Sequence, residues 1–219
     1  MSPCQVVVIG STGYLGSRLI PRLIERGHAV TAVVRPGSRA HELTGCRIVR
    51  ADPLDAASLA PHVHAGETIV QLVGVPKPAP WKGPQFRAVD LAAGLVSIDV
   101  ARAAQVDHFV YVSVARPAPI MKDYIDVRRA CEERLEAAGL RATILRPWYI
   151  LGPGHWWPLA LQPVYRLMEQ FPATHDAAVR LGLVTLHEML TALVWSIEHP
   201  PASRRVIEVP EIRRLGGLS

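Results

Sequence analysis

Short apolar runs rich in β-branched residues alternate with stretches of helical period along most of this chain. The apolar runs cover residues 6–9, 29–34, 47–49, 68–73, 108–114 and 142–146, and the helix-period stretches cover 14–26, 55–63, 85–104 and 120–138. Continuous apolar runs of this length are typical of parallel strands that are buried on both faces. The helices between them then form right-handed crossovers, so the pattern predicts an α/β fold with a doubly wound parallel sheet.

The last part of the chain departs from this alternation. Residues 147–163 are rich in Pro, Gly and Trp, and they precede an expected helix over 186–198 and an expected strand over 205–209. We expect this tail to form a small C-terminal lobe over the carboxyl ends of the strands, where such sheets bind ligands. A chain of 219 residues that is 49% hydrophobic can bury one sizeable core. We therefore predict one compact unit, with a main domain over 1–154 and the lobe over 155–219.

The first apolar run ends in three regularly spaced glycines, in the stretch QVVVIGSTGYLG of residues 5–16. At Gly10, Gly13 and Gly16 the missing Cβ atoms permit a tight turn, the close approach of a pyrophosphate and close packing of helix on sheet. The N–H groups at the start of the helix, helped by the hydroxyls of Ser11 and Thr12, can bind phosphate oxygens. An ordinary glycine-rich turn is the alternative. Because a strand precedes the glycines and a helix follows them, we favour dinucleotide binding.

The end of the second apolar run indicates which dinucleotide is preferred. A site for NAD usually has an acid here that binds the ribose 2′-hydroxyl, whereas an arginine accommodates the 2′-phosphate of NADP. This chain has Arg35, followed by Ser38 and Arg39, and no acid competes with them. We therefore expect NADP(H) to be preferred, with NAD(H) possible. The alternative is that Arg35 is a solvated turn residue.

These stretches resemble one known family. VVVIGSTGYLGSRLIPRLIERGHAVTAVVRPGSR (6–39) is similar to the extended and atypical branch of the short-chain dehydrogenase/reductase superfamily, whose NAD(P)-binding Rossmann proteins include epimerase/dehydratase-like and NmrA-like members. The later blocks ADPLD (51–55), QLVG (71–74), HFVYVSVA (108–115) and LRPWYILGPG (145–154) also resemble it. The resemblance implies that these blocks contact the adenine, line the adenosine ribose, form the fifth strand, and form the sixth strand with the nicotinamide-side loop. The expected cofactor-binding residues are Gly10, Ser11, Thr12, Gly13, Tyr14, Leu15, Gly16, Arg35, Ser38, Arg39, Asp52, Pro53, Leu72, Val73, Gly74, Ser113 and Pro147.

The resemblance also implies a catalytic set, which this chain matches only in part. Enzymes of the family use a tyrosine as proton donor or acceptor, a lysine four residues later, and a Ser or Thr hydroxyl on the substrate oxygen. Tyr124 occupies the tyrosine position, Arg128 replaces the lysine, and Val114 stands at the hydroxyl position. Tyr124 and Arg128 are therefore the candidate catalytic residues.

An ordinary solvated helix would explain the same residues. Arg128 with Glu132 and Arg129 with Glu133 are i,i+4 pairs of the kind found on exposed helix faces. Tyr124 would then be a surface or core aromatic residue.

Two functions remain open on these observations. The first is an oxidoreductase that passes hydride between NADPH and a small carbonyl, quinone-like or sugar-nucleotide substrate. The second is a non-catalytic protein that senses NADP(H) and reports it through a partner. His155, Trp156 and Trp157 follow the expected nicotinamide-side loop, and they form either the wall of an apolar substrate pocket or the core of the lobe.

Composition narrows the location and the partners. Cys4, Cys46 and Cys131 have no CxxC spacing, which favours a reducing cytoplasm, and we expect neither a signal peptide nor a membrane span. The formal net charge of +5 is scattered without a basic run, so no nucleic-acid or membrane partner is expected. A small-molecule substrate or none is expected. No metal site is expected, because His62 and His64 point in different directions on a helix. The oligomeric state is open.

Overall fold

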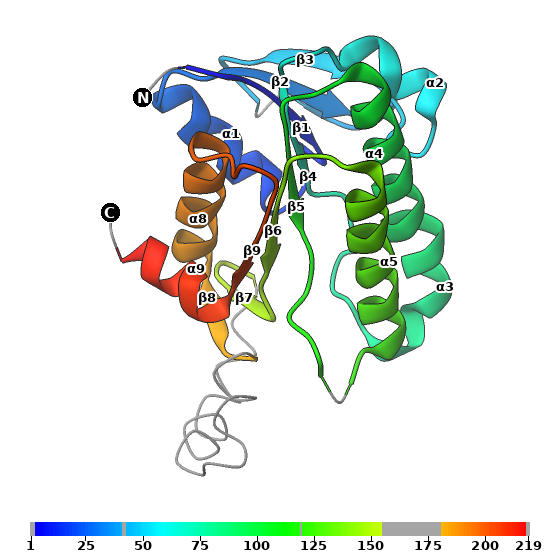
Figure 1. The fold of residues 1–219 in the computed structure, drawn as a ribbon, viewed down its shortest axis with the longest axis vertical. Coiled ribbons are helices and arrows are strands. Elements are labelled where there is room, and N and C mark those ends of the chain that lie inside the picture. Colours follow the sequence, from blue (N-terminus) through cyan, green and yellow to red (C-terminus); the bar gives the residue numbers. More distant parts are fainter. Residues whose placement is uncertain (1–2, 41–42, 119, 155–180, 218–219) are drawn as a thin grey trace.

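The computed structural model describes residues 3–40, 43–118, 120–154 and 181–217. Its centre is a seven-stranded sheet in the order β3-β2-β1-β4-β5-β6-β9, with each strand parallel to its neighbours (Figure 1). The strands are β1 (Gln5–Ile9), β2 (Ala29–Val34), β3 (Arg47–Arg50), β4 (Thr68–Gln71), β5 (His108–Val112), β6 (Ala142–Arg146) and β9 (Arg204–Glu208). The strand order reverses between β1 and β4, which confirms the predicted doubly wound sheet. Because all seven strands are parallel, their carboxyl ends lie along one edge.

Helices cover both faces of this sheet (Figure 1). On one face α1 (Gly16–Glu25) contacts α8 (Leu186–Glu198). The other face carries α2 (Ala56–Leu59), η1 (Ala60–His62), η2 (Pro80–Lys82), α3 (Gly83–Gln85), η3 (Phe86–Leu91), α4 (Ala92–Ala104) and α5 (Lys122–Ala138). The single helix expected over 85–104 is therefore interrupted at its start by η3, which is a π-helical segment.

The core lies on both sides of the sheet, as the continuous apolar runs of the strands require. Along β1, Val6 and Val8 face the layer of α1 and α8, whereas Val7 and Ile9 face the layer of α4 and α5. All four are at most 1% exposed. The sheet is thus a rigid central layer, and the segments that follow the carboxyl ends of its strands are held in fixed positions relative to one another.

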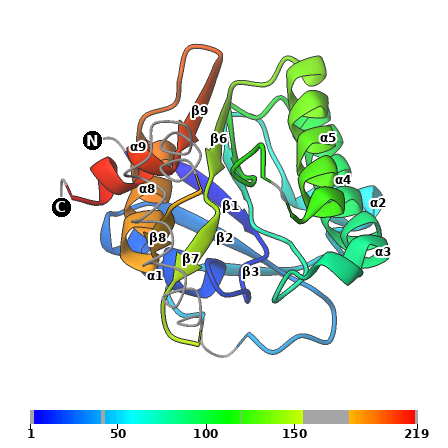
Figure 2. The ribbon, with the colours of Figure 1, turned by 90° about the horizontal axis from the view of Figure 1, so that it is seen from below.

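The C-terminal part divides between the main layers and a small addition. The expected tail helix is α8, which packs on α1, and the expected tail strand is β9, which pairs with β6 in the main sheet. Among the described residues of this part, β7 (Tyr149–Leu151), β8 (Leu183–Thr185) and α9 (Val209–Gly216) form an addition, on the α8 side of the sheet (Figure 2). Part of the expected lobe is therefore an extension of the sheet and its helical layer.

Two further expectations from the sequence concern an aromatic cluster and membrane spans. The aromatic cluster of His155, Trp156 and Trp157 lies outside the described residues. None of the described helices combines the length and the apolar character that crossing a bilayer requires.

Candidate cofactor-binding and active site

The glycine-rich loop lies where the strand order reverses, in contact with the segment that follows β4. Gly10 has a φ of +91°, and a Cβ atom there would lie 2.9 Å from the backbone atoms Leu72 C and Val73 N. A Cβ atom on Gly16 would overlap the carbonyl oxygen of Gly10. The fold itself therefore requires both glycines, Gly10 for its left-handed conformation and Gly16 for the approach of α1 to the loop.

Gly13 is different, because the fold restricts it only weakly. Its φ is not in the left-handed region, and the one close neighbour of an added Cβ atom would be the carbonyl oxygen of Gly10 at 3.1 Å. The helix that follows begins at Gly16, and its N-cap residue Leu15 makes no side-chain capping hydrogen bond. N–H groups at such a helix start are a ready site for an anion. Space at Gly13 beside a helix start without a side-chain cap is what a bound pyrophosphate would require, and the contact itself stays a prediction.

The two hydroxyls of the loop have different environments. Ser11 is fully buried, and its hydroxyl donates a 2.5 Å hydrogen bond to the carbonyl oxygen of Val33 in β2. The one proton of the Ser11 hydroxyl therefore joins the loop to the neighbouring strand in this structure, and its contact with a phosphate oxygen stays a prediction. Thr12 is exposed at the tip of the loop.

Tyr14 and Leu15 connect the loop to the rest of the molecule. Leu15 is half-buried and packs against the core on the α1 side of the sheet. The hydroxyl of Tyr14 lies directly against Gly152, where a Cβ atom would overlap it, and the Arg18 guanidinium lies 4.5 Å from the Tyr14 ring centroid. The glycine-rich loop and the expected nicotinamide-side loop are thus in contact.

The turn over residues 35–39, directly after β2, contains two arginines and no acid. Arg35 and Arg39 are exposed, and the N–H of Ser38 donates to the carbonyl oxygen of Arg35 at 3.1 Å, which closes a turn between them. Among the described residues, neither arginine has a carboxylate within ion-pair distance. This turn is therefore free to receive an anion such as a 2′-phosphate.

Asp52, Pro53 and Pro147 lie at the carboxyl ends of β3 and β6. The Asp52 carboxylate accepts the N–H of Leu54 at 3.0 Å, which shapes the turn after β3, and Pro53 is buried beneath it. Pro147 is also buried, and its carbonyl oxygen accepts the N–H of Ala115 at 3.0 Å. The fold thus brings these residues to the same sheet edge as the glycines, and their contacts with a cofactor stay a prediction.

Arg128 lies beneath the segment that follows β4. Its guanidinium donates through Nη2 to Asp90 at 2.5 Å and through Nη1 to the carbonyl oxygen of Val112 at 2.9 Å. The second carboxylate oxygen of Asp90 accepts the N–H of Val75 at 3.0 Å. A Cβ atom on Gly74 would lie 2.6 Å from Nη2 of Arg128. One buried ion pair therefore joins α5, η3 and the ends of β4 and β5.

This geometry overturns the interpretation of α5 as solvated around Arg128. The side chains of Arg128 and Asp90 are 7% and 0% exposed, and Glu132 is also buried. Arg128 pairs with Asp90 of η3 instead of Glu132. Arg128 and Glu132 are both buried residues of α5, so neither lies on a solvated helix face. The second expected pair, Arg129 with Glu133, is confirmed as an exposed contact of 3.6 Å.

Asp90 was not among the residues expected to build the site. It lies in η3, and π-helical turns often occur at functional sites. Burial raises the pKa of the Asp90 carboxyl, and the charge of Arg128 opposes that rise. An acid within the apolar sequence Val89-Asp90-Leu91 was the available signal, since a buried carboxylate requires a partner.

Tyr124 stands one helical turn before Arg128, as the spacing predicted. Its ring centroid lies 4.9 Å from that of Phe86, and the Arg128 guanidinium carbon lies 5.0 Å from the Tyr124 centroid. The tyrosine is half-buried. Phe86 and Arg128 therefore fix the orientation of the ring, while its catalytic role stays a prediction.

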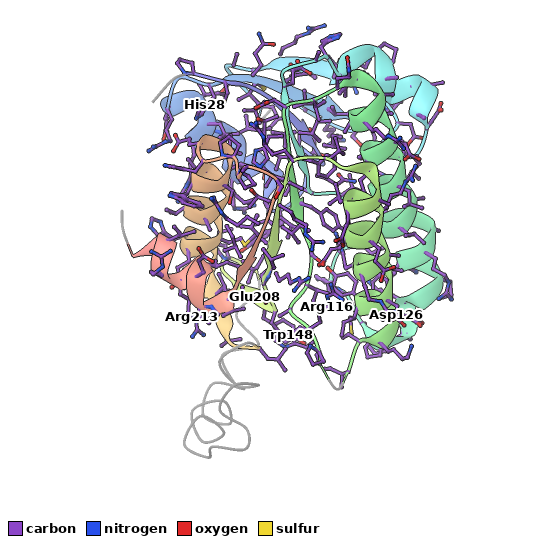
Figure 3. The ribbon with its side chains drawn as sticks, in the orientation of Figure 1. His28, Arg116, Asp126, Trp148, Glu208 and Arg213 are labelled. Carbon is purple, nitrogen blue, oxygen red and sulfur yellow. The ribbon has the colours of Figure 1, made fainter. Side chains whose placement is uncertain are left out.

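A second charged cluster occupies the ends of β5 and β6. Ser113 donates a 2.5 Å hydrogen bond to the carboxylate of Glu132, which also accepts from Arg146 at 3.0 Å and from Arg116 at 2.6 Å. Figure 3 shows Arg116 near this edge of the sheet. Burial works to raise the pKa of Glu132, but the hydrogen bonds from Arg146 and Ser113 and the nearby charges hold it below its ordinary value. Ser113 and Val114 are both buried. The Ser113 hydroxyl donates its proton to the Glu132 carboxylate.

Residues 10–153 match the family described as NAD(P)H-binding. The chain belongs to the NAD(P)H-binding family. Its relatives include the ceramide reductase of Caulobacter vibrioides, 26% identical over 96% of this chain and 66% of that protein. A 3-diazoavenalumate denitrifying reductase of Streptomyces is 32% identical over 68% of this chain and 57% of that protein. The chain thus spans two thirds or less of the length of these relatives.

Solved structures agree on the fold of this NAD(P)H-binding protein. The enzyme WbmH of Bordetella bronchiseptica, crystallised in complex with NAD⁺, superposes with a TM-score of 0.67 at 17% identity, over 99% of this chain and 80% of that chain. A putative epimerase of Burkholderia cenocepacia superposes with a TM-score of 0.69 at 19% identity, over 99% and 82%. The chain therefore has a Rossmann fold like these neighbours, and its family indicates a nicotinamide dinucleotide as cofactor.

Proposed function

We propose that this chain is an NADP(H)-dependent oxidoreductase that acts on a small carbonyl, quinone-like or sugar-nucleotide substrate. One observation carries the proposal: the start of α1, which has no side-chain cap, lies beside the open position at Gly13 and on the same sheet edge as Arg35 and Arg39, which have no ion-pair partner among the described residues. The reductases among the relatives support the class of reaction. Their substrates differ, so the substrate of this chain follows from none of them.

Different residues would bind different parts of the cofactor and the substrate in the proposed site. The N–H groups at the start of α1 would bind the pyrophosphate, while Arg35 and Arg39 would bind the 2′-phosphate. The backbone of Leu72, Val73 and Gly74 would line the adenosine ribose. Bound NADPH would supply the hydride. Tyr124 would hold the substrate oxygen and give it a proton.

A second candidate function is a protein that binds NADP(H) without catalysis. It is favoured by the state of the groups that would assist Tyr124. Val114 has no hydroxyl, the Ser113 hydroxyl is held by Glu132, and the Nη groups of Arg128 are held by Asp90 and the Val112 carbonyl. Such a protein would report the bound cofactor through a partner.

Replacing Tyr124 tests the enzyme against the sensor. If Tyr124 donates the proton, Tyr124→Phe lowers turnover by about 10² to 10⁴, because a positioned acid or base contributes that much. Its affinity for NADPH stays as in the wild type. The measurement is NADPH absorbance with a panel of aldehydes, ketones and quinones, alongside calorimetry of cofactor binding. Unchanged turnover in the variant excludes Tyr124 as the donor, and tight binding with no turnover on the panel favours the sensor.

Replacing Arg35 tests the preference for NADP(H). A charge-assisted hydrogen bond contributes roughly 1.5–3 kcal/mol, so Arg35→Ala weakens NADPH binding about tenfold or more and leaves NADH binding nearly unchanged. Calorimetric titration of both cofactors measures this. Equal losses for NADPH and NADH would contradict the assignment of Arg35 to the 2′-phosphate.

The cytoplasm is the proposed location. Cys4, Cys46 and Cys131 are free thiols in the structure, which is typical of proteins in a reducing compartment. The partners stay as expected from the sequence, a small-molecule substrate or none.

A further inference from the structure

A third arginine stands beside the proposed 2′-phosphate site. Arg50 is the last residue of β3, and it is the register partner of Val34, the last residue of β2. Arg35 follows Val34 directly. Because β2 and β3 are parallel neighbours, Arg35 and Arg50 both lie where adjacent strands end, at the ligand-binding edge of the sheet.

Arg50 also contacts the turn that carries the other two arginines. Its Nη1 atom donates to the carbonyl oxygen of Ser38 at 3.2 Å. Ser38 lies between Arg35 and Arg39, and its own N–H donates to the Arg35 carbonyl oxygen at 3.1 Å. The Arg50 guanidinium therefore reaches from β3 over the turn 35–39. It has five N–H donors, so a single hydrogen bond to Ser38 leaves most of them for a ligand.

Among the described residues, arginines outnumber acids at this corner of the sheet. Arg35, Arg39 and Arg50 are exposed, and none of the three has a carboxylate within ion-pair distance among the residues that the structure describes. The nearby Asp52 turns its carboxylate to the N–H of Leu54. Three like charges around one turn repel one another, and a dianion among them removes that repulsion.

We propose that Arg50 is a specificity-determining residue, the third cation of a site that selects a dinucleotide carrying a 2′-phosphate. This inference rests on the proposed NADP(H) binding and extends it to a strand that sequence motifs did not assign. Arg50 acts through its charge on the phosphate, with the Ser38 carbonyl holding its guanidinium in place.

The test compares two arginines of one strand. Arg47 is the first residue of β3, is exposed, and lies at the opposite edge of the sheet, so Arg47→Ala is the matched control for Arg50→Ala. Calorimetry with NADPH, NADH and adenosine 2′,5′-bisphosphate gives the affinities. We expect Arg50→Ala to weaken NADPH and the bisphosphate about tenfold and NADH less than about twofold, with Arg47→Ala unchanged. Circular dichroism checks that each variant is folded.

Arg50→Gln separates charge from loop support. Glutamine keeps an amide donor for the Ser38 carbonyl and has no charge, so it binds NADPH as weakly as Arg50→Ala if the charge selects the phosphate. Full affinity in Arg50→Gln, equal losses for NADPH and NADH, or no loss in Arg50→Ala would each overturn the inference. If Arg35→Ala abolishes selectivity while Arg50→Ala retains it, only the role of Arg50 fails. A wild type without selectivity removes the proposed NADP(H) preference and this inference together.

Discussion

Arg128→Ala is expected to lower the free energy of unfolding by about 3–5 kcal/mol, because removing one partner of a buried ion pair leaves the other charge buried and uncompensated. The side chain of Asp90 is fully buried, and it would lose the 2.5 Å hydrogen bond that Arg128 provides. The Val112 carbonyl oxygen would lose its donor as well. Urea denaturation followed by circular dichroism measures the loss.

The neighbouring arginine provides the control for this prediction. Arg129 lies on the same helix and forms exposed contacts with Asp126 and Glu133, so Arg129→Ala is expected to cost at most about 0.5 kcal/mol. The double variant Arg128→Met/Asp90→Leu removes both charges and is expected to recover much of the lost stability. If Arg128→Ala is as stable as Arg129→Ala, the buried pair does not have the role assigned to it.

Gly13→Val is expected to weaken the binding of NADPH and NADH by about a hundredfold or more, a loss of roughly 2.7 kcal/mol or greater. Gly10 and Gly16 are required by the fold itself, whereas Gly13 has no left-handed φ and only one close neighbour. A branched side chain at Gly13 would thus fill space proposed for the pyrophosphate without overlapping the sheet. Calorimetry with each cofactor measures the effect.

Gly13→Val is expected to lose cofactor binding while it keeps the folded structure of the wild type. Ala103→Val adds a branched side chain at an exposed position of α4 and is expected to leave cofactor binding unchanged. Far-ultraviolet circular dichroism of Gly13→Val is expected to match that of the wild type. Normal cofactor affinity in Gly13→Val would mean that the loop does not hold the pyrophosphate.

Much of the fold could be predicted because its signals are local. The strands β1 and β2 and the helix α8 coincide with the expected ranges to within one residue, since buried parallel strands and amphipathic helices have strong periods. The pairing of β9 with β6 is not a local property. A strand in the tail was expected, but its place in the main sheet depends on contacts between residues far apart in the sequence.

The site shows the same division between local and distant signals. The glycine loop is read from spacing alone, because its turn and helix start are contiguous. The partner of Arg128 cannot be predicted from spacing in this way. Spacing along α5 indicated Glu132, whereas the observed partner, Asp90, is 38 residues away. The partner of Ser11 is also distant in the sequence, because its hydroxyl donates to the carbonyl oxygen of Val33 in a neighbouring strand. Tertiary packing determines which partners buried polar groups have.

Titration of the wild-type chain with NADPH and NADH in a calorimeter tests the central claim most directly. We expect both to bind at one site per chain and NADPH to bind about tenfold tighter or more, because the arginines at the end of β2 would contact the 2′-phosphate. Saturation with one cofactor is expected to block the other. Failure of both cofactors to bind would contradict the account, and tighter binding of NADH would contradict its assignment of Arg35 and Arg39.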